Sequence, residues 1–105
     1  MVHVVATIQL NSGVRERFLA EFLRIVPDVH AEDGCLEYGA AVDCPTGIAA
    51  QPPVRPDVVV VVEKWRDVAA LEAHLAAPHM TDYRARVRDY VTTVELQVLE
   101  PAGPA

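Results

Sequence analysis

The sequence is poor in the features that mark secreted, membrane-bound or nucleic-acid-binding proteins. Its two cysteines, Cys35 and Cys44, do not form a disulfide framework, so we expect free thiols and a cytoplasmic protein. No segment approaches the roughly 18 consecutive apolar residues of a membrane span, and no basic stretch opens a secretory signal. One lysine and eight arginines face fifteen acidic residues, and the net charge of -6 disfavours nucleic acid and anionic membranes as partners.

Several common enzyme signatures are also missing. The chain has no glycine-rich phosphate loop, no G-x-S-x-G elbow and no C-x-x-C pair, which excludes the enzyme classes that depend on them. Its 105 residues, 51% of them hydrophobic, are enough for one core and too few for two. We therefore expect one globular domain with a small, neutral or apolar partner.

Hydrophobic periodicity predicts the first two elements. Residues 2–10 alternate in polarity, as a strand with two different faces does. Residues 14–29 carry apolar side chains every three or four positions, which is typical of an amphipathic helix. We expect a turn and a helix cap at residues 11–13, and a kink or an early stop at Pro27.

The remaining pattern completes a ferredoxin-like α+β fold of βαββααβ order, with an antiparallel sheet and helices on one face. Asp67 is a predicted helix cap, and Pro78 is predicted to open the last helix. The domain is expected to cover residues 1–100, with a flexible tail at 101–105. The predicted segments are a strand at 35–42, a loop at 43–57, a strand from 58, a helix at 67–76, a helix from 78 and a strand at 91–99.

The valine run Val58–Val62 lacks polar alternation, as expected of a strand covered on both faces. Helices cover only one face of so small a sheet, so the other face is expected to pack on a second copy. The predicted assembly is a homodimer forming a dimeric α/β-barrel. The loop at 43–57 is long for a hairpin, which indicates a lid or an interface arm, with a plain surface excursion as the alternative.

The candidate catalytic residues lie on the two short helices. His74 and His79 are candidates for proton transfer, because a neutral imidazole has a pKa near 6.5. Arg84 is a candidate for stabilising an anionic oxygen. The alternative for each histidine is structural: His74 at the boundary of the core, bonded to backbone or water, and His79 at a helix terminus.

The burial of the His74 side chain is predicted from the apolar stripe of its helix. Val68, Leu71 and Leu75 are predicted to form the buried stripe of the helix at 67–76. His74 falls about a quarter to a third of a turn from the centre of that stripe. This position predicts a side chain at the border between buried and exposed, within reach of a cavity beneath the helix.

Aromatic residues are predicted to form a flat slot in which a planar substrate stacks. Core packing is the alternative, because large rings dominate small cores. The candidate substrate-binding residues are Tyr38, Trp65, Tyr83 and Tyr90.

Metal binding receives little support from spacing. His74 and His79 are separated by Pro78 and do not share a helical face as ligands at i and i+4 do. His79 and Asp82 could belong to a 2-His-1-carboxylate site, but their spacing is not specific. The spacing therefore predicts no metal site.

Three segments resemble, in order and spacing, the antibiotic biosynthesis monooxygenase family. Other pieces, including Phe22-x-x-Ile25-Val-Pro27, resemble the quinol monooxygenase type within it, and the resemblance covers nearly the whole chain. The three segments are Glu32-x-Gly34-Cys35-x-x-Tyr38, Glu63-x-Trp65 and Leu71-Glu-Ala-His74-Leu-x-x-Pro78-His79-Met80-x-x-Tyr83.

The resemblance implies a dimer whose sheets face each other and which oxidises quinols or polycyclic phenols with O₂, without metal or flavin. Haem-degrading relatives use asparagine, tryptophan and histidine where this chain has Ala6 or Thr7, His74 and Arg84, so haem degradation is not expected. Two alternatives keep the fold. One is an isomerase or dehydratase-like enzyme acting on a small metabolite, and the other is a non-catalytic, aromatic-binding stress module.

Overall fold

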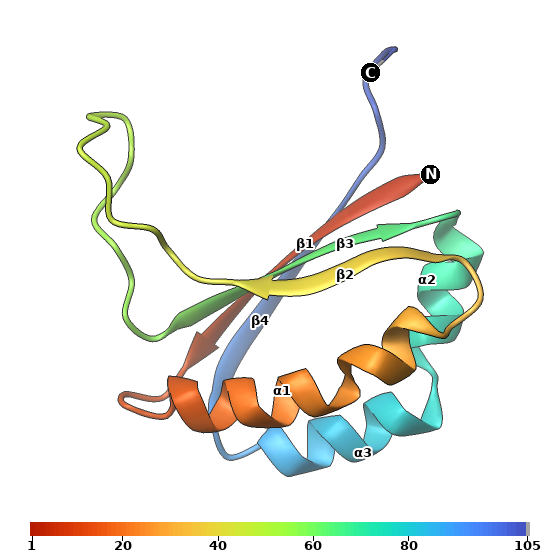
Figure 1. Ribbon diagram of the computed structural model, residues 1–105, viewed down its shortest axis with the longest axis horizontal. Coiled ribbons are helices and arrows are strands. Elements are labelled where there is room, and N and C mark those ends of the chain that lie inside the picture. The colour runs from red at the N-terminus through yellow and green to blue at the C-terminus, as the bar shows by residue number, and fades with distance from the viewer. Residues whose placement is uncertain (105) are drawn as a thin grey trace.

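The computed structural model describes residues 1–104 and has the predicted βαββααβ order (Figure 1). The four strands form one antiparallel sheet in the order β2-β3-β1-β4. The predicted fold class is confirmed, and the sheet is open, so a barrel requires a second copy. The elements are β1 (Val2–Leu10), α1 (Arg15–His30), β2 (Cys35–Ala41), β3 (Val58–Trp65), α2 (Val68–Leu75), α3 (Pro78–Val87) and β4 (Val91–Leu99).

The core lies between one face of the sheet and the helices. Helices α1 and α3 lie side by side, as Figure 1 shows. Alternate residues of β1, such as Val4 and Ile8, are buried against this layer, and α1 contributes Phe18 and Phe22, which stack on each other. Burial of such side chains stabilises the fold by about 1.5–3 kcal/mol each.

The second face of the valine run of β3 is covered only in part within the subunit, where Val58 is buried and Val60 is half-buried. Val59 and Val61 are buried beneath the helices, whereas Val62 points to the opposite face and is 46% exposed. The expectation of cover on both faces is therefore not met within the subunit, because no helix of the described residues packs on the second face. A partner subunit as the cover remains a prediction.

Strand β4 carries a second exposed apolar stripe. Directly paired residues of antiparallel strands share a face, and the β1 partners of this stripe are buried under the helices. The stripe itself is exposed, because β4 is the outer strand of the sheet and the helices do not cover it. It consists of Val94, Leu96 and Val98.

The predictions for the two ends of α1 are met only in part: residues 12–13 form the expected turn, but the predicted cap is wrong. The N-cap residue is Val14, which makes no side-chain capping bond; the preceding turn is held by the Gly13 N–H, which donates to Asp57 Oδ1 at 3.1 Å. Of the two outcomes predicted at Pro27, the early stop is wrong, because the helix continues to His30, and the kink stays a prediction. Pro27 has no N–H for the carbonyl of Leu23, and Leu23 lies on the exposed side of the helix, where water can bond that carbonyl.

The segment 43–57 has no helix or strand, as predicted, and projects from the sheet as an arm at the left of Figure 1. Its ends are tied by Arg55, whose Nε donates to Asp43 Oδ2 at 2.9 Å. Cys35 and Cys44 are free thiols. Residue 105 of the predicted tail at 101–105 lies outside the described residues. Among residues 1–104, no helix combines the length and the apolar character needed to cross a membrane.

Candidate active site

A cavity of about 590 Å³ lies between the sheet and the helices. Its walls are largely apolar and include the β4 stripe residues Val94 and Leu96. This size falls within the roughly 300–1,000 Å³ of small-molecule sites, which combine apolar walls with a few polar groups. No residue of the 43–57 arm lines it, so the arm does not act as a lid over this cavity within the subunit. The polar and aromatic lining residues are Phe18, Phe22, Tyr38, Glu63, His74, Tyr83, Arg84 and Arg88.

His74 is fully buried, at 1% exposure, and not at the border of the core as predicted. Asp67 caps α2 as expected, accepting the Ala70 N–H at 2.8 Å. The predicted stripe is wrong at two positions, because Val68 is 47% exposed and Leu75 is 40% exposed. The buried face of α2 consists of Ala70, Leu71 and His74.

Gly34 explains why α2 is rotated about its axis so that His74, rather than Val68 or Leu75, faces the core. A Cβ built on Gly34 would lie 2.6 Å from the Cβ of Ala70, and its φ of +82° belongs to the left-handed region that glycine adopts readily. The missing side chain lets the turn before β2 approach the Ala70 side of α2. His74, four residues after Ala70, lies on the same helical face and therefore points inward.

Aromatic rings hold His74 on two sides. The ring of Trp65 lies 4.6 Å from that of His74, centre to centre, with 32° between the planes. The ring of Tyr38 meets His74 edge-on at 5.3 Å. These contacts restrict the imidazole to one orientation in a water-poor environment.

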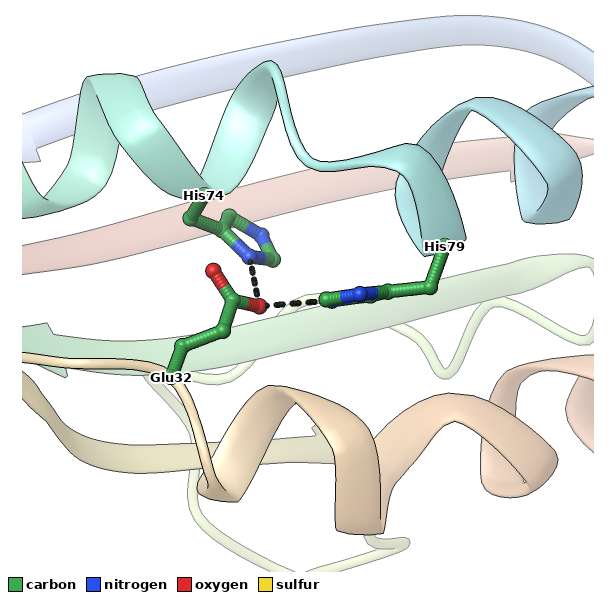
Figure 2. Close-up of side chains that lie close together, drawn as sticks. All are labelled: Glu32, His74 and His79. Atoms are coloured by element: carbon green, nitrogen blue, oxygen red, sulfur yellow. Dashed lines mark hydrogen bonds and ion pairs between the residues drawn. The ribbon is translucent and has the colours of Figure 1, made fainter.

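A carboxylate joins the two candidate histidines. Glu32 Oε2 lies 2.8 Å from His74 Nδ1 and 2.8 Å from His79 Nε2 (Figure 2). The three side chains come from the turn after α1, from α2 and from α3, so the histidines converge although they share no helical face. Glu32 was not among the predicted site residues. Its place at the start of the motif Glu32-x-Gly34-Cys35-x-x-Tyr38 was the signal that could have pointed to it.

This arrangement sets the tautomer of His74. An ionised carboxylate only accepts hydrogen bonds, so His74 Nδ1 carries the proton and donates to Glu32. The neutral ring then has a free lone pair on Nε2, which Figure 2 shows turned away from Glu32. Burial lowers the pKa of His74, and the hydrogen bond and charge of Glu32 oppose this effect. The neutral base is therefore favoured near pH 7.

Glu63 is a second buried acid of the cavity that sequence reasoning missed as a site residue. It is 4% exposed, and its Oε1 accepts the Trp65 Nε1–H at 2.8 Å. Burial raises the pKa of Glu63 to about 7, the bond from Trp65 opposes this, and the nearby charge of Glu32 adds to it. Carboxylates are rarely buried without such a partner, so an acid within a valine strand was a usable signal.

The predicted substrate-binding aromatics divide into two groups. Tyr38 and Tyr83 line the cavity, and burial raises the pKa of both phenols, so they remain protonated and can donate hydrogen bonds. Trp65 lies behind His74 and is not part of the lining, and neither is the half-buried Tyr90. Arg84 borders the cavity and donates to the carbonyl of Leu75.

The nitrogens of the two histidines and an oxygen of Glu32 form the group of described side chains best placed to hold a metal ion. Their ligand atoms all lie within 4.8 Å of one another. The carboxylate of this group is Glu32, whereas the exposed Asp82 is not part of it.

Comparison with known proteins shows the family of this chain. A sequence model of the antibiotic biosynthesis monooxygenase family matches residues 1–86. The chain belongs to this family. It is 39% identical over 103 residues to the "Probable quinol monooxygenase YgiN" of Escherichia coli K12, which covers 96% of this chain and 98% of that protein.

Solved structures share the fold of this chain. Rv0793 of Mycobacterium tuberculosis superimposes with a TM-score of 0.78 and 28% identity, covering 99% of this chain and 97% of its own. PA3566 of Pseudomonas aeruginosa gives a TM-score of 0.78 and 25% identity, covering 97% and 94%. The family resemblance predicted from motifs is thus confirmed. Of its motif residues, Glu63 and His74 line the cavity, and Glu32 is hydrogen-bonded to both His74 and His79.

Proposed function

We propose that this chain is a cofactor-free monooxygenase that oxidises quinols or related polycyclic phenols with O₂. The observation that carries the proposal is the pair of Glu32 and His74, because His74 lines a largely apolar cavity and its Nδ1 bond to Glu32 leaves Nε2 unprotonated. The family supports a monooxygenase in general, and the name of the relative YgiN, a probable quinol monooxygenase, supports a quinol as the substrate class.

Proton removal is the central step. O₂ is a triplet and reacts slowly with closed-shell molecules, so an enzyme without a cofactor must make the substrate itself electron-rich. Deprotonation of a quinol hydroxyl by His74 Nε2 does this, and Glu32 stabilises the resulting imidazolium. Tyr38, Tyr83 and Arg84 border the same space and can stabilise the phenolate oxygen.

Glu63 is placed to serve the second hydroxyl of a quinol. With its pKa raised to about 7, it is partly ionised at neutral pH and can accept a proton. In the full reaction the quinol supplies all four electrons. One oxygen atom enters the ring, the other leaves as water, and the product is a hydroxylated quinone.

The homodimer is part of the proposal. Val62 on the open face of the sheet and the stripe Val94, Leu96 and Val98 on β4 are exposed apolar surfaces of the kind that oligomers cover. Because Val94 and Leu96 also line the cavity, a partner packed on β4 would close its open side. A cytoplasmic setting remains a prediction from the sequence.

An oxygen electrode tests the reaction. The purified protein is supplied with a panel of quinols, O₂ uptake is recorded, and products are weighed by mass spectrometry. The proposal expects O₂ uptake above the uncatalysed rate and a product with one oxygen atom more than the simple quinone. Substrate turnover without O₂ uptake would indicate an isomerase, and binding without turnover would indicate a sequestering module. Either result would overturn the proposed monooxygenase activity.

A further inference from the structure

We infer that Glu32, His74 and His79 form a binding site for a divalent metal ion of the zinc and copper class, and that such an ion inhibits the enzyme. The site itself follows from the geometry of these three side chains. The inhibitory effect rests on the proposed function, because it acts through His74 as the base.

The distances match a coordination sphere. Zinc binds histidine nitrogen and carboxylate oxygen at about 2.0–2.2 Å, so neighbouring ligand atoms of a tetrahedral site lie about 3.3–3.6 Å apart. Glu32 Oε2 lies 2.8 Å from each histidine nitrogen, and all three atoms fall within 4.8 Å. An ion can therefore replace the two hydrogen-bonded protons with small side-chain movements.

The ligand types select the class of ion. Two imidazoles and one carboxylate suit Zn²⁺, Cu²⁺, Ni²⁺ and Co²⁺, whereas Mg²⁺ and Ca²⁺ prefer all-oxygen sites. Three protein ligands leave the remaining positions to water, as in open zinc sites.

The ion can reach the site from solvent, and neighbouring side chains hold the ligands in place. The side chain of His79 is 28% exposed and that of Glu32 is 14% exposed, while His74 is 2% exposed. An ion can thus enter from the His79 side without passing through the substrate cavity, whose lining does not include Glu32 or His79. Trp65 packs on His74 and holds its ring in place, as groups around metal ligands do.

Metal binding reverses the tautomer of His74. An ion on Nδ1 needs the lone pair of that nitrogen, so the proton of the neutral ring must sit on Nε2. Nε2 then donates a hydrogen bond and can no longer accept the substrate proton. No net proton is released from His74 in this exchange. The ion therefore blocks the base without occupying the cavity.

Cobalt titration tests the site. Co²⁺ is added to the chelator-treated wild type, and its visible absorption is followed together with calorimetry of Zn²⁺ binding. We expect one ion per chain, with affinity reduced about tenfold or more in Glu32→Gln and His79→Asn. His3→Asn and Cys44→Ser are matched controls, since both side chains lie outside the cluster, and they should bind as the wild type does.

A kinetic experiment tests the inhibitory effect. The rate of quinol oxidation is measured with added Zn²⁺, and each variant is compared with its own metal-free rate. Zn²⁺ should inhibit the wild type at the concentration at which it binds, and His79→Asn should require about tenfold more. Absence of the cobalt spectrum, or equal affinity in Glu32→Gln, overturns the site even if quinol turnover is normal. Activation by Zn²⁺ overturns the inhibitory effect. If no quinol is oxidised but the spectrum and its losses appear, the proposed reaction fails and the site stands.

Discussion

Glu32 Oε2 accepts a hydrogen bond from His74 Nδ1 at 2.8 Å, although the two residues are 42 positions apart in the chain. The bond crosses from the turn after α1 to the buried face of α2. It sets the tautomer of the histidine at the cavity, and the proposed chemistry depends on it.

Replacement of His74 by alanine should lower quinol-dependent O₂ uptake by about 10²–10⁴-fold, the usual contribution of a general base. His3→Ala is the control, because His3 lies on β1 outside the cavity lining. Circular dichroism must first show that the variant is folded, since His74 is buried. An unchanged rate in a folded variant would show that His74 is not the base.

Glu32→Gln keeps the shape of the side chain and removes its charge. The amide cannot stabilise the imidazolium as the carboxylate does, so kcat should fall by about 10- to 100-fold. KM should change little, because Glu32 does not line the cavity. Steady-state kinetics against quinol concentration separates the two constants. A rise in KM at constant kcat would contradict the positioning role.

Gly34→Ala should destabilise the fold by about 2 kcal/mol or more, because the new Cβ meets Ala70 and the positive φ strains alanine. Gly13→Ala has a similar φ in open space and should cost about 1 kcal/mol, and Gly39→Ala has neither problem. Urea unfolding measures all three. Equal losses for Gly34→Ala and Gly13→Ala would show that the contact with α2 is unimportant.

Glu63 should make stability depend on pH. Its folded pKa of about 7 is above the ordinary 4.5, so the folded state holds the proton more tightly. This contribution is present below pH 4.5 and is lost as pH rises through 7, up to about 3 kcal/mol. The lowered pKa of His74 acts with the opposite sign, so a variant is needed to isolate Glu63.

Urea unfolding of the wild type and Glu63→Gln at pH 5 and pH 8 isolates the effect. The stability of the wild type relative to the variant should decrease from pH 5 to pH 8. The lowered pKa values of Asp33, Asp43 and Asp67 act only in more acidic solution. A constant difference between the two proteins would show that the carboxyl of Glu63 titrates normally.

Val62→Asp should weaken the proposed dimer, because it places a charge on the open face of the sheet. Sedimentation should show a dimer for the wild type and a shift toward monomer for the variant. Leu23→Asp is a matched control, since Leu23 is also an exposed apolar residue but lies on α1. A monomeric wild type would remove the dimer from the proposal.

The order of elements could be derived from the sequence, because strand and helix periods are local. The alternation of residues 2–10, the valines of β3 and the cap at Asp67 predicted their elements correctly. The antibiotic biosynthesis monooxygenase motifs led to the family for the same reason, since each is a short run of neighbouring residues.

Only the tertiary structure decided the site. Val68 and Leu75 form the apolar stripe expected from the pattern of α2, yet they are exposed, because the contact between Gly34 and Ala70 turns His74 inward. Glu32 meets His74 only after α1, β2 and α2 have packed. Local periodicity determined which elements form, whereas close packing between distant segments determined which side chains meet. No local pattern contains that information.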